Sequence, residues 1–327
     1  MTKRERVLAA IERRAVDRPP IAFWRHVPDV DHTPQGLAEA MLRFHLRWDL
    51  DLIKVMSSGV YCVEDWGCRV AYQGHPGGAK RCTEHAVKRA ADWARLRALD
   101  PGAGALGREL EAVRLIRKDR ADDAPILMTI FTPFTIATKL AGDLALQSID
   151  TAPDSLRAAL EVITETTARY AAEALAAGAD GVFFATQTAS AEAVSEAVST
   201  TWDLPYARRV LAGVRGGSQL TMLHLHGRGV FWDLWTALPV HVVNWHDRLS
   251  VPTLAEASRR FAGGLAAGLA ESRTLLDGPP AAVADEARDA IHQAGGRGLI
   301  VTPGCVLPLA VSDAHLQAAV DMVRAPA

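Results

Sequence analysis

Residues 155–186, SLRAALEVITETTARYAAEALAAGADGVFFAT, place a helix-patterned segment directly before a short run of β-forming residues. The helical pattern covers 155–178 and ends in glycine, whereas GVFFAT at 181–186 has the length and apolarity of a buried strand. The same alternation recurs along the chain, with a second clear helical pattern at 280–296. The β-rich runs are PIAFWR (20–25), LDLIKVM (50–56), ILMTIF (126–131), GVFFAT (181–186), LTMLHLH (220–226), VHVVNW (240–245), RFAGGL (260–265) and GLIVTP (298–303). Strands that alternate with helices predict a parallel sheet, and eight repeats predict one (β/α)8 TIM barrel domain over residues 1–327.

A doubly wound open sheet is the competing architecture. It would place a glycine-rich, phosphate-binding turn after an early strand, and neither PIAFWR nor LDLIKVM is followed by one. The Gly263-Gly264 pair comes late and lacks the spacing of a nucleotide-binding loop. The long segment 57–125 contains VEDWGCRVAYQGHPGG, which predicts a hairpin-like insertion after the second strand that forms a lid or rim over the barrel mouth.

Composition excludes several classes of protein. Hydrophobic residues make up 49% of the 327 residues and charged residues 23%, which excludes wholesale disorder. With 36 basic against 38 acidic residues, the chain lacks the excess positive charge of a nucleic-acid binder. No apolar stretch is long enough to span a membrane, and the charged N-terminus lacks the apolar core of a signal peptide. These features, and four cysteines without a CxxC pair, predict a cytoplasmic protein.

Histidine and cysteine residues follow the ends of the predicted strands, where barrel enzymes place their chemistry. His224 and His226 are two residues apart on one strand, so both side chains leave from the same face. Cys305 follows the last predicted strand in TPGCVLP. Two imidazoles and a thiolate suit zinc, and His246 or Asp247 is a further candidate ligand or a partner of a ligand. The alternative is that these residues are ordinary buried histidines and a small buried thiol.

Several segments carry a resemblance to a known family. RERVLAAIERRAVDRPPIAFWRH at the start, PFTIATKLAG in the middle, and RFAGGLAAG with AGGRGLIVTPGCVLPLAVSDAHLQAAVDMVR at the end resemble the uroporphyrinogen decarboxylase superfamily. The resemblance implies a (β/α)8 barrel. It also implies one of two activities, since the superfamily holds porphyrinogen decarboxylases and zinc-dependent methyltransferases that act with corrinoid proteins, thiols or folates.

The decarboxylase motifs are only partly present. Arg25 matches the first arginine of the motif after the first strand, but the second arginine is missing. The aspartate position holds Ser58, the tyrosine position Lys139 and the histidine position Cys305. Without the aspartate, a porphyrinogen loses the carboxylate that would hold its pyrrole nitrogens, so decarboxylation of uroporphyrinogen is not expected.

The methyltransferase motifs fit better. That branch places zinc on a His-x-Cys pair after the fifth strand and on a cysteine after the eighth, and this chain has His224-Leu225-His226 and Pro303-Gly304-Cys305. The second histidine replaces a cysteine, which makes the site less rich in thiolate and more Lewis acidic. Activation of a thiol benefits from added thiolate charge on zinc, whereas a site with two histidines could activate an oxygen or ether substrate instead, so the acceptor stays open.

The resemblance therefore predicts a zinc-dependent methyltransferase with one zinc per chain, held by His224, His226 and Cys305. The methyl group would move between a small-molecule donor or acceptor and a carrier, either a corrinoid on a partner protein or tetrahydrofolate. At the predicted barrel mouth, we expect Arg25 and Asp247 to be catalytic residues. Asp180 and Gln187 are expected to bind the methyl carrier. The alternatives are a decarboxylase of uroporphyrinogen or of a smaller acid gripped by Arg25, and a non-enzymatic tetrapyrrole carrier, although the chain lacks a corrinoid carrier's DxHxxG motif.

Overall fold

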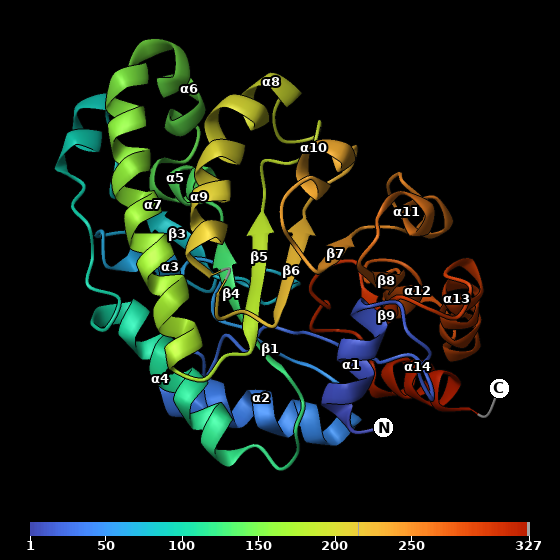
Figure 1. Ribbon diagram of the computed structural model, residues 1–327. Coiled ribbons are helices and arrows are strands. Elements are labelled where there is room, and N and C mark those ends of the chain that lie inside the picture. Colours follow the sequence, from blue (N-terminus) through green and yellow to red (C-terminus); the bar gives the residue numbers. More distant parts are fainter. Residues whose placement is uncertain (215, 326–327) are drawn as a thin grey trace.

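Seven parallel strands form the main sheet of the computed structural model, which describes residues 1–214 and 216–325. The sheet order is β1-β4-β5-β6-β7-β8-β9, so every strand pairs with the next one along the chain, and the sheet curls (Figure 1). A separate antiparallel pair, β2 and β3, lies between β1 and β4 in the sequence. The strands are β1 (Ile53–Val55), β2 (Arg69–Ala71), β3 (Arg81–Glu84), β4 (Ile126–Phe131), β5 (Gly181–Thr186), β6 (Leu220–Leu225), β7 (Val242–Trp245), β8 (Gly264–Leu269) and β9 (Leu299–Pro303).

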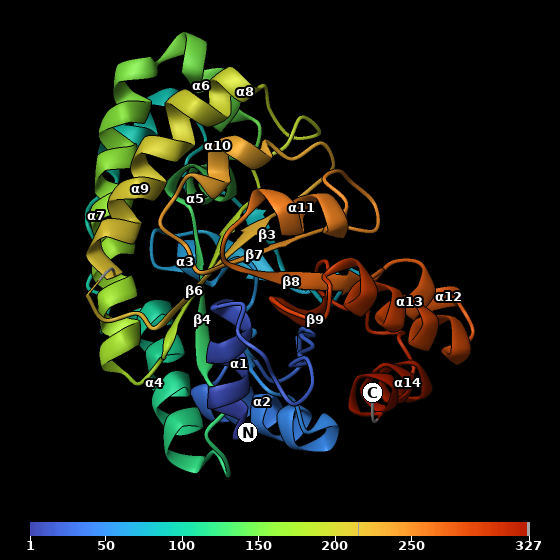
Figure 2. The same cartoon turned by 45° about the vertical axis from the view of Figure 1, so that its right-hand side comes forward.

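Helices connect the strands and cover the outside of the sheet. Figure 1 shows α7 and α9 beside β4–β6, and Figure 2 brings β8, β9, α13 and α14 forward. The helices are α1 (Lys3–Ile11), α2 (Pro34–Trp48), α3 (Tyr61–Glu64), α4 (Gly104–Asp119), α5 (Pro133–Ala141), α6 (Leu144–Thr151), α7 (Pro153–Ala176), α8 (Glu196–Val198), α9 (Leu204–Val214), α10 (Trp232–Thr236), α11 (Leu254–Arg260), α12 (Thr274–Asp277), α13 (Pro280–Gln293) and α14 (Asp313–Arg324), with a 3₁₀ helix η1 (Ala90–Arg95) and a π-helical turn η2 (Ser199–Asp203). Both predicted helical patterns are confirmed as α7 and α13. Each helix begins at a proline, a residue that is favoured in the first helical turn. No helix in the described part of the chain is long and apolar enough to cross a membrane.

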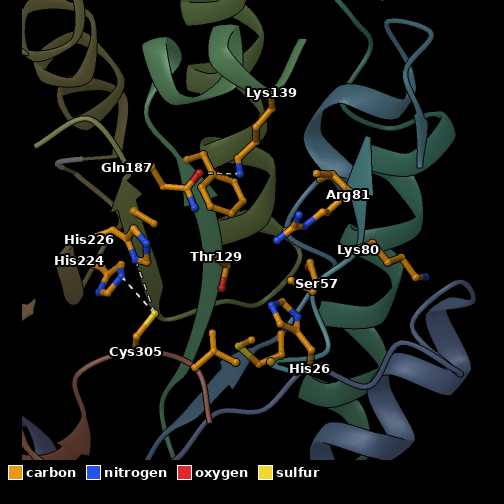
Figure 3. A pocket seen from close by; sticks show the side chains of 18 of the residues that line it. His26, Ser57, Lys80, Arg81, Thr129, Lys139, Gln187, His224, His226 and Cys305 are labelled. Atoms are coloured by element: carbon orange, nitrogen blue, oxygen red, sulfur yellow. Dashed lines mark hydrogen bonds between the residues drawn. The ribbon is translucent and has the colours of Figure 1, made fainter. Parts of the chain in front are cut away.

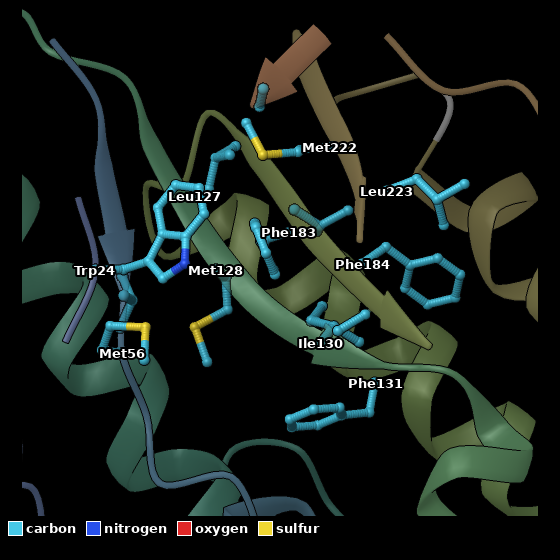
Figure 4. Packing of buried hydrophobic residues seen from close by; sticks show 14 of the residues in the cluster. Trp24, Met56, Leu127, Met128, Ile130, Phe131, Phe183, Phe184, Met222 and Leu223 are labelled. Atoms are coloured by element: carbon cyan, nitrogen blue, oxygen red, sulfur yellow. The ribbon is translucent and has the colours of Figure 1, made fainter. Parts of the chain in front are cut away.

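The strands read as continuous apolar runs because both of their faces are buried. Every residue of β4, β5 and β6 is buried. Side chains alternate between the faces, so Phe183 points inward and packs edge-on against Trp24, while Phe184 points outward (Figure 4). Burying each such ring stabilises the fold by about 1.5–3 kcal/mol.

The first predicted strand, PIAFWR, does not form a strand of the main sheet. Only Ile21 bridges to Val301 of β9, and Asp51, just before β1, donates its amide to the Ile21 carbonyl. The Ile21 amide donates instead to the carboxylate of Asp51, and Pro20 has no amide hydrogen to offer. The ladder therefore stops after one bridge.

The seventh predicted strand lies about four residues later than RFAGGL. The observed β8 is GLAAGL, and residues 254–260 of the preceding segment form α11. The strand consists of small residues because its neighbours approach closely. A Cβ added at Gly264 would lie 2.9 Å from the Ile11 Cα of α1, and one at Gly268 would lie 2.6 Å from the Ala290 Cβ of α13.

Candidate metal centre

Four potential metal ligands meet at the carboxyl ends of β6, β7 and β9. One ligand atom each from His224, His226, His246 and Cys305 lies within 4.8 Å of every other. The Cys305 Sγ is 3.8 Å from the His224 Nε2 and 3.7 Å from the His226 Nδ1, and the His246 Nε2 is 3.5 Å from that same His226 atom. Figure 3 shows Cys305 facing both histidines of β6.

Asn244 fixes the orientation and tautomer of His224. The two residues are partners in the β6–β7 ladder, and the His224 Nδ1 is 2.6 Å from the Asn244 Oδ1. The Asn244 amide nitrogen donates to the carbonyls of Ala266 and Pro303, so its oxygen is the atom that accepts. The His224 Nδ1 must then carry the proton, which leaves its Nε2 lone pair free to face Cys305.

Glu271 holds His246 in the same manner. Its Oε1 is 2.8 Å from the His246 Nδ1, which turns the Nε2 toward the cluster. Burial lowers the pKa of His246, but hydrogen bonding to Cys305 and Glu271 outweighs that effect and raises the pKa to about 10. A carboxylate behind a ligating imidazole is a common arrangement in zinc proteins.

The donor set fits zinc. Tetrahedral zinc with its usual bond lengths places nitrogen and sulfur ligands about 3.3–3.6 Å apart, close to the spacing of these side chains. Burial on its own would raise the pKa of the Cys305 thiol, but the facing imidazoles of His224, His226 and His246 lower it well below its ordinary value. Cys305 is therefore in an environment that favours the thiolate, the form that binds metals.

Three of the four residues, His224, His226 and Cys305, form one wall of a cavity of about 540 Å³. Trp24, Phe131 and Phe183 provide apolar surface, and the segment around β3 provides the wall that faces the cluster. Figure 3 shows this opposition, with Arg81 across the cavity from His226. The described lining includes four lysines and arginines and no aspartate or glutamate; the basic residues are Lys54, Lys80, Arg81 and Lys139.

Two of these lysines, the buried Lys54 and the half-buried Lys139, have no acidic partner in the described lining. Lys54 donates to the Met56 sulfur at 2.7 Å, and its Nζ lies 4.2 Å from the centre of the Phe183 ring. Burial lowers its pKa to about 7. Lys139 donates to the Gln187 Oε1 at 2.8 Å, and burial lowers its pKa as well. By contrast, Lys80 is already ion-paired with Asp31.

Of the seven residues predicted from the sequence to form the site, four line the cavity: His224, His226, Cys305 and Gln187. Arg25, Asp247 and Asp180 lie outside the lining. Gln187 borders the cavity. Arg25 lies outside the lining, where its guanidinium donates to the Val311 carbonyl at 2.7 Å. The prediction that it lies at the cavity is wrong.

Asp247 and Asp180 also lie outside the cavity lining, although Asp247 follows a strand end as predicted. Asp247 follows β7 but turns away from the cavity and accepts from the backbone amide of Gly268 at 3.1 Å. Asp180 precedes β5 and therefore lies at the opposite end of the strands, where it is ion-paired with Arg4 and Arg117.

Three residues of the cluster's surroundings were not assigned from the sequence. His246 was considered only as an alternative, and Asn244 and Glu271 were missed. Asn244 carried a usable signal, because an amide inside the apolar run VHVVNW needs a buried partner. Glu271 was hidden by the misplaced β8, since it follows the true end of that strand at Leu269.

Comparison with known proteins identifies the family. The model of the uroporphyrinogen decarboxylase (URO-D) family matches residues 2–326, so the chain belongs to that family. The methylcobamide:CoM methyltransferase MtbA of Methanosarcina acetivorans is 21% identical over 341 residues, which cover 99% of this chain and 98% of that protein. A uroporphyrinogen decarboxylase of Roseiflexus sp. is 25% identical over 235 residues, 65% of this chain and 66% of the other.

A solved methyltransferase structure from Methanosarcina mazei matches the whole fold. Its TM-score is 0.85 at 21% identity, with 98% of both chains covered. The relatives similar along the full length are thus methyltransferases, and the predicted methyltransferase branch of the family is confirmed.

Proposed function

We propose that this enzyme transfers a methyl group between a methylated corrinoid on a partner carrier protein and a small acceptor that is activated at a zinc ion. The observation that carries the proposal is the convergence of four potential ligands, three of which line a cation-lined cavity. His224, His226 and Cys305 border the cavity, and His246 lies behind them. Two full-length relatives named methylcobamide:CoM methyltransferases support a corrinoid rather than tetrahydrofolate as the carrier.

His224, His226 and Cys305 would hold the ion. Bound zinc supplies Lewis acidity, which lowers the pKa of a coordinated nucleophile and keeps it ionised at neutral pH. His246 is the fourth donor within reach, and Glu271 keeps its Nε2 directed at the site. We infer that His246 could serve as a fourth ligand, at the place where an acceptor's nucleophile would need to reach the ion.

The cations that line the cavity indicate the class of acceptor. Burying an ammonium without a counterion costs free energy, which a bound anion would offset. Lys54 and Lys139 therefore fit an acceptor with a carboxylate, sulfonate or phosphate at one end and a nucleophile at the other. Decarboxylation of an acid gripped by Arg25 is not favoured, because Arg25 is outside the cavity lining.

We also propose that residues 20–22 close the curled sheet into a full barrel. On one side, Val301 of β9 donates to the Pro20 carbonyl and accepts from the Ala22 amide, and on the other, Ile21 is hydrogen-bonded to Asp51 beside β1. This segment would stand in the place of the eighth strand.

The function can be tested with free methylcobalamin as the methyl donor. We expect zinc-dependent loss of its methyl group in the presence of 3-mercaptopropionate, with much weaker activity toward 2-mercaptoethanol, which carries no acidic group. The His226→Ala variant should lose both zinc and activity, whereas Arg25→Met should keep both. Equal activity with and without bound zinc would refute the proposal.

A further inference from the structure

A second group of metal-binding side chains lies outside the candidate metal centre. Cys68 directly precedes β2, Cys82 lies in β3 and His85 follows β3, and one ligand atom of each lies within 4.8 Å of the other two. Both cysteines are free thiols. We propose that Cys68, Cys82 and His85 form a second binding site for a thiophilic divalent ion such as zinc.

All three side chains converge on one carbonyl at the end of α5. The Lys139 oxygen lies 3.3 Å from the Cys82 Sγ, 3.1 Å from the His85 Nδ1 and 3.9 Å from the Cys68 Sγ. The backbone amide of Ala86 donates to the Cys68 sulfur at 3.3 Å, an interaction that stabilises a thiolate. Two sulfurs and an imidazole gathered around one point are the soft donors that zinc prefers over calcium or magnesium.

The backbone beside the cluster makes room for the imidazole. Gly142, just after α5, has a φ of +59°, and a Cβ there would lie 3.1 Å from the His85 Nε2. A larger residue would therefore push the ring away from the two cysteines. The glycine at position 142 thus allows the His85 ring to lie where it does.

Metal binding at this site balances with proton release. Two thiols lose their protons to solvent and become thiolates, and no redox change is needed. The neutral imidazole would give up its hydrogen bond to the Lys139 carbonyl and offer an unprotonated ring nitrogen as the third ligand. Because Cys82 and His85 border the cavity and Cys68 does not, the fourth position is open to water or to a donor from the cavity. The ion would join the residues that flank β2 and β3, beside the α5 carbonyl of Lys139.

Zinc analysis of matched variants tests the proposal. Cys68→Ser and Cys82→Ser should each lose about one zinc per chain relative to the wild type, whereas Cys305→Ser should retain this zinc. Cys62→Ser is the control, because Cys62 is a free buried cysteine outside both clusters. Wild-type zinc content in both Cys68→Ser and Cys82→Ser would overturn the proposal. If Cys305→Ser keeps its full zinc content while Cys82→Ser loses zinc, the second site stands and the proposed function fails instead.

A measurement on the wild-type protein covers the case in which the serine variants do not fold. Alkylation by iodoacetamide followed by peptide mass analysis should find Cys68 and Cys82 protected, and at least tenfold faster to react once a chelator has removed the metal. Equal reactivity with and without chelator would overturn the proposal, as would a Cys68–Cys82 disulfide in the metal-free protein as isolated.

Discussion

At the amino-terminal end of the strands, α1 delivers Arg4 to Asp180 and Arg6 to Asp51, at 2.5 Å and 2.7 Å. At the carboxyl end, Lys54 and Lys139 face a cavity whose described lining contains no carboxylate. Both ends hold charged side chains away from solvent, but these arginines have carboxylate partners, whereas Lys54 and Lys139 have none in the described lining. A buried charge without a partner costs free energy. We therefore infer that the charges at the amino-terminal end stabilise the fold, whereas those at the carboxyl end bind a ligand.

The same contrast holds for the number of partners. The fully buried carboxylate of Asp51 also meets Arg18 at 2.7 Å and accepts the Ile21 amide, so its oxygens are well occupied. The Cys305 sulfur at the other end faces the imidazoles of His224 and His226. Variants at the two ends should therefore separate stability from activity.

The largest effect is expected from Cys305→Ser. Loss of the thiolate should empty the zinc site and reduce methyl transfer by about a thousandfold, since Lewis-acid activation is worth several kcal/mol. The measurements are zinc content and the rate of methylcobalamin demethylation. The melting temperature should match that of the metal-free wild type, and a fall below it would weaken the contrast between the two ends.

Asp51→Asn should affect stability instead. Removing the negative charge leaves Arg6 and Arg18 partly unpaired and should cost about 3–5 kcal/mol in the free energy of unfolding. Urea denaturation measures this loss, and Asp180→Asn, at a more accessible carboxylate, should cost less. Below the unfolding transition, kcat/KM should stay at the wild-type value. A large loss of kcat/KM in the folded variant would contradict a purely structural role.

Glu271→Gln should weaken zinc binding by about 10–100-fold without emptying the protein at saturating zinc. The amide cannot hold His246 with the charge of a carboxylate, so the imidazole becomes a poorer ligand. Competition with a chromophoric chelator gives the affinity. Asp247→Asn is the matched control, a buried carboxylate that faces away from the cluster, and it should bind zinc normally.

Much of the fold could be predicted because most strands are buried on both faces and read as unbroken apolar runs. GVFFAT and ILMTIF match β5 and β4 residue for residue. Strands whose position depends on close packing rather than on apolar side chains were not predictable in this way. GLAAGL is a strand because small residues let α1 and α13 approach, and Ile21 makes only one bridge because a side chain takes its amide.

The site was predictable to the extent that strand ends were placed correctly. His224, His226 and Cys305 follow strands whose ends were well defined, and they lie together. Asp180 was misassigned because it precedes a strand, which puts it at the other end of the sheet. Glu271 was missed because an error of about four residues in β8 concealed the residue that follows it. Proximity between Cys68 and Cys82 depends on the β2–β3 pairing, which spacing alone does not specify.

The smallest effect, and the most specific one, is expected from Lys54→Met. The methionine fills the space beside Phe183 without the charge, so the KM for an anionic acceptor should rise about tenfold, equivalent to about 1.4 kcal/mol, with little change in kcat.

Burial lowers the pKa of Lys54 to about 7, so the ammonium dominates below that pH and is lost above it. In the wild type, the KM for 3-mercaptopropionate should therefore increase as pH rises through about 7, whereas the variant should lack this dependence. The neutral 2-mercaptoethanol controls for ionisation of the thiol, since its KM should not respond to the substitution. If both thiols respond alike, Lys54 supports the fold of the cavity rather than the recognition of charge, and the proposed distinction between the two ends of the strands would rest on the metal cluster alone.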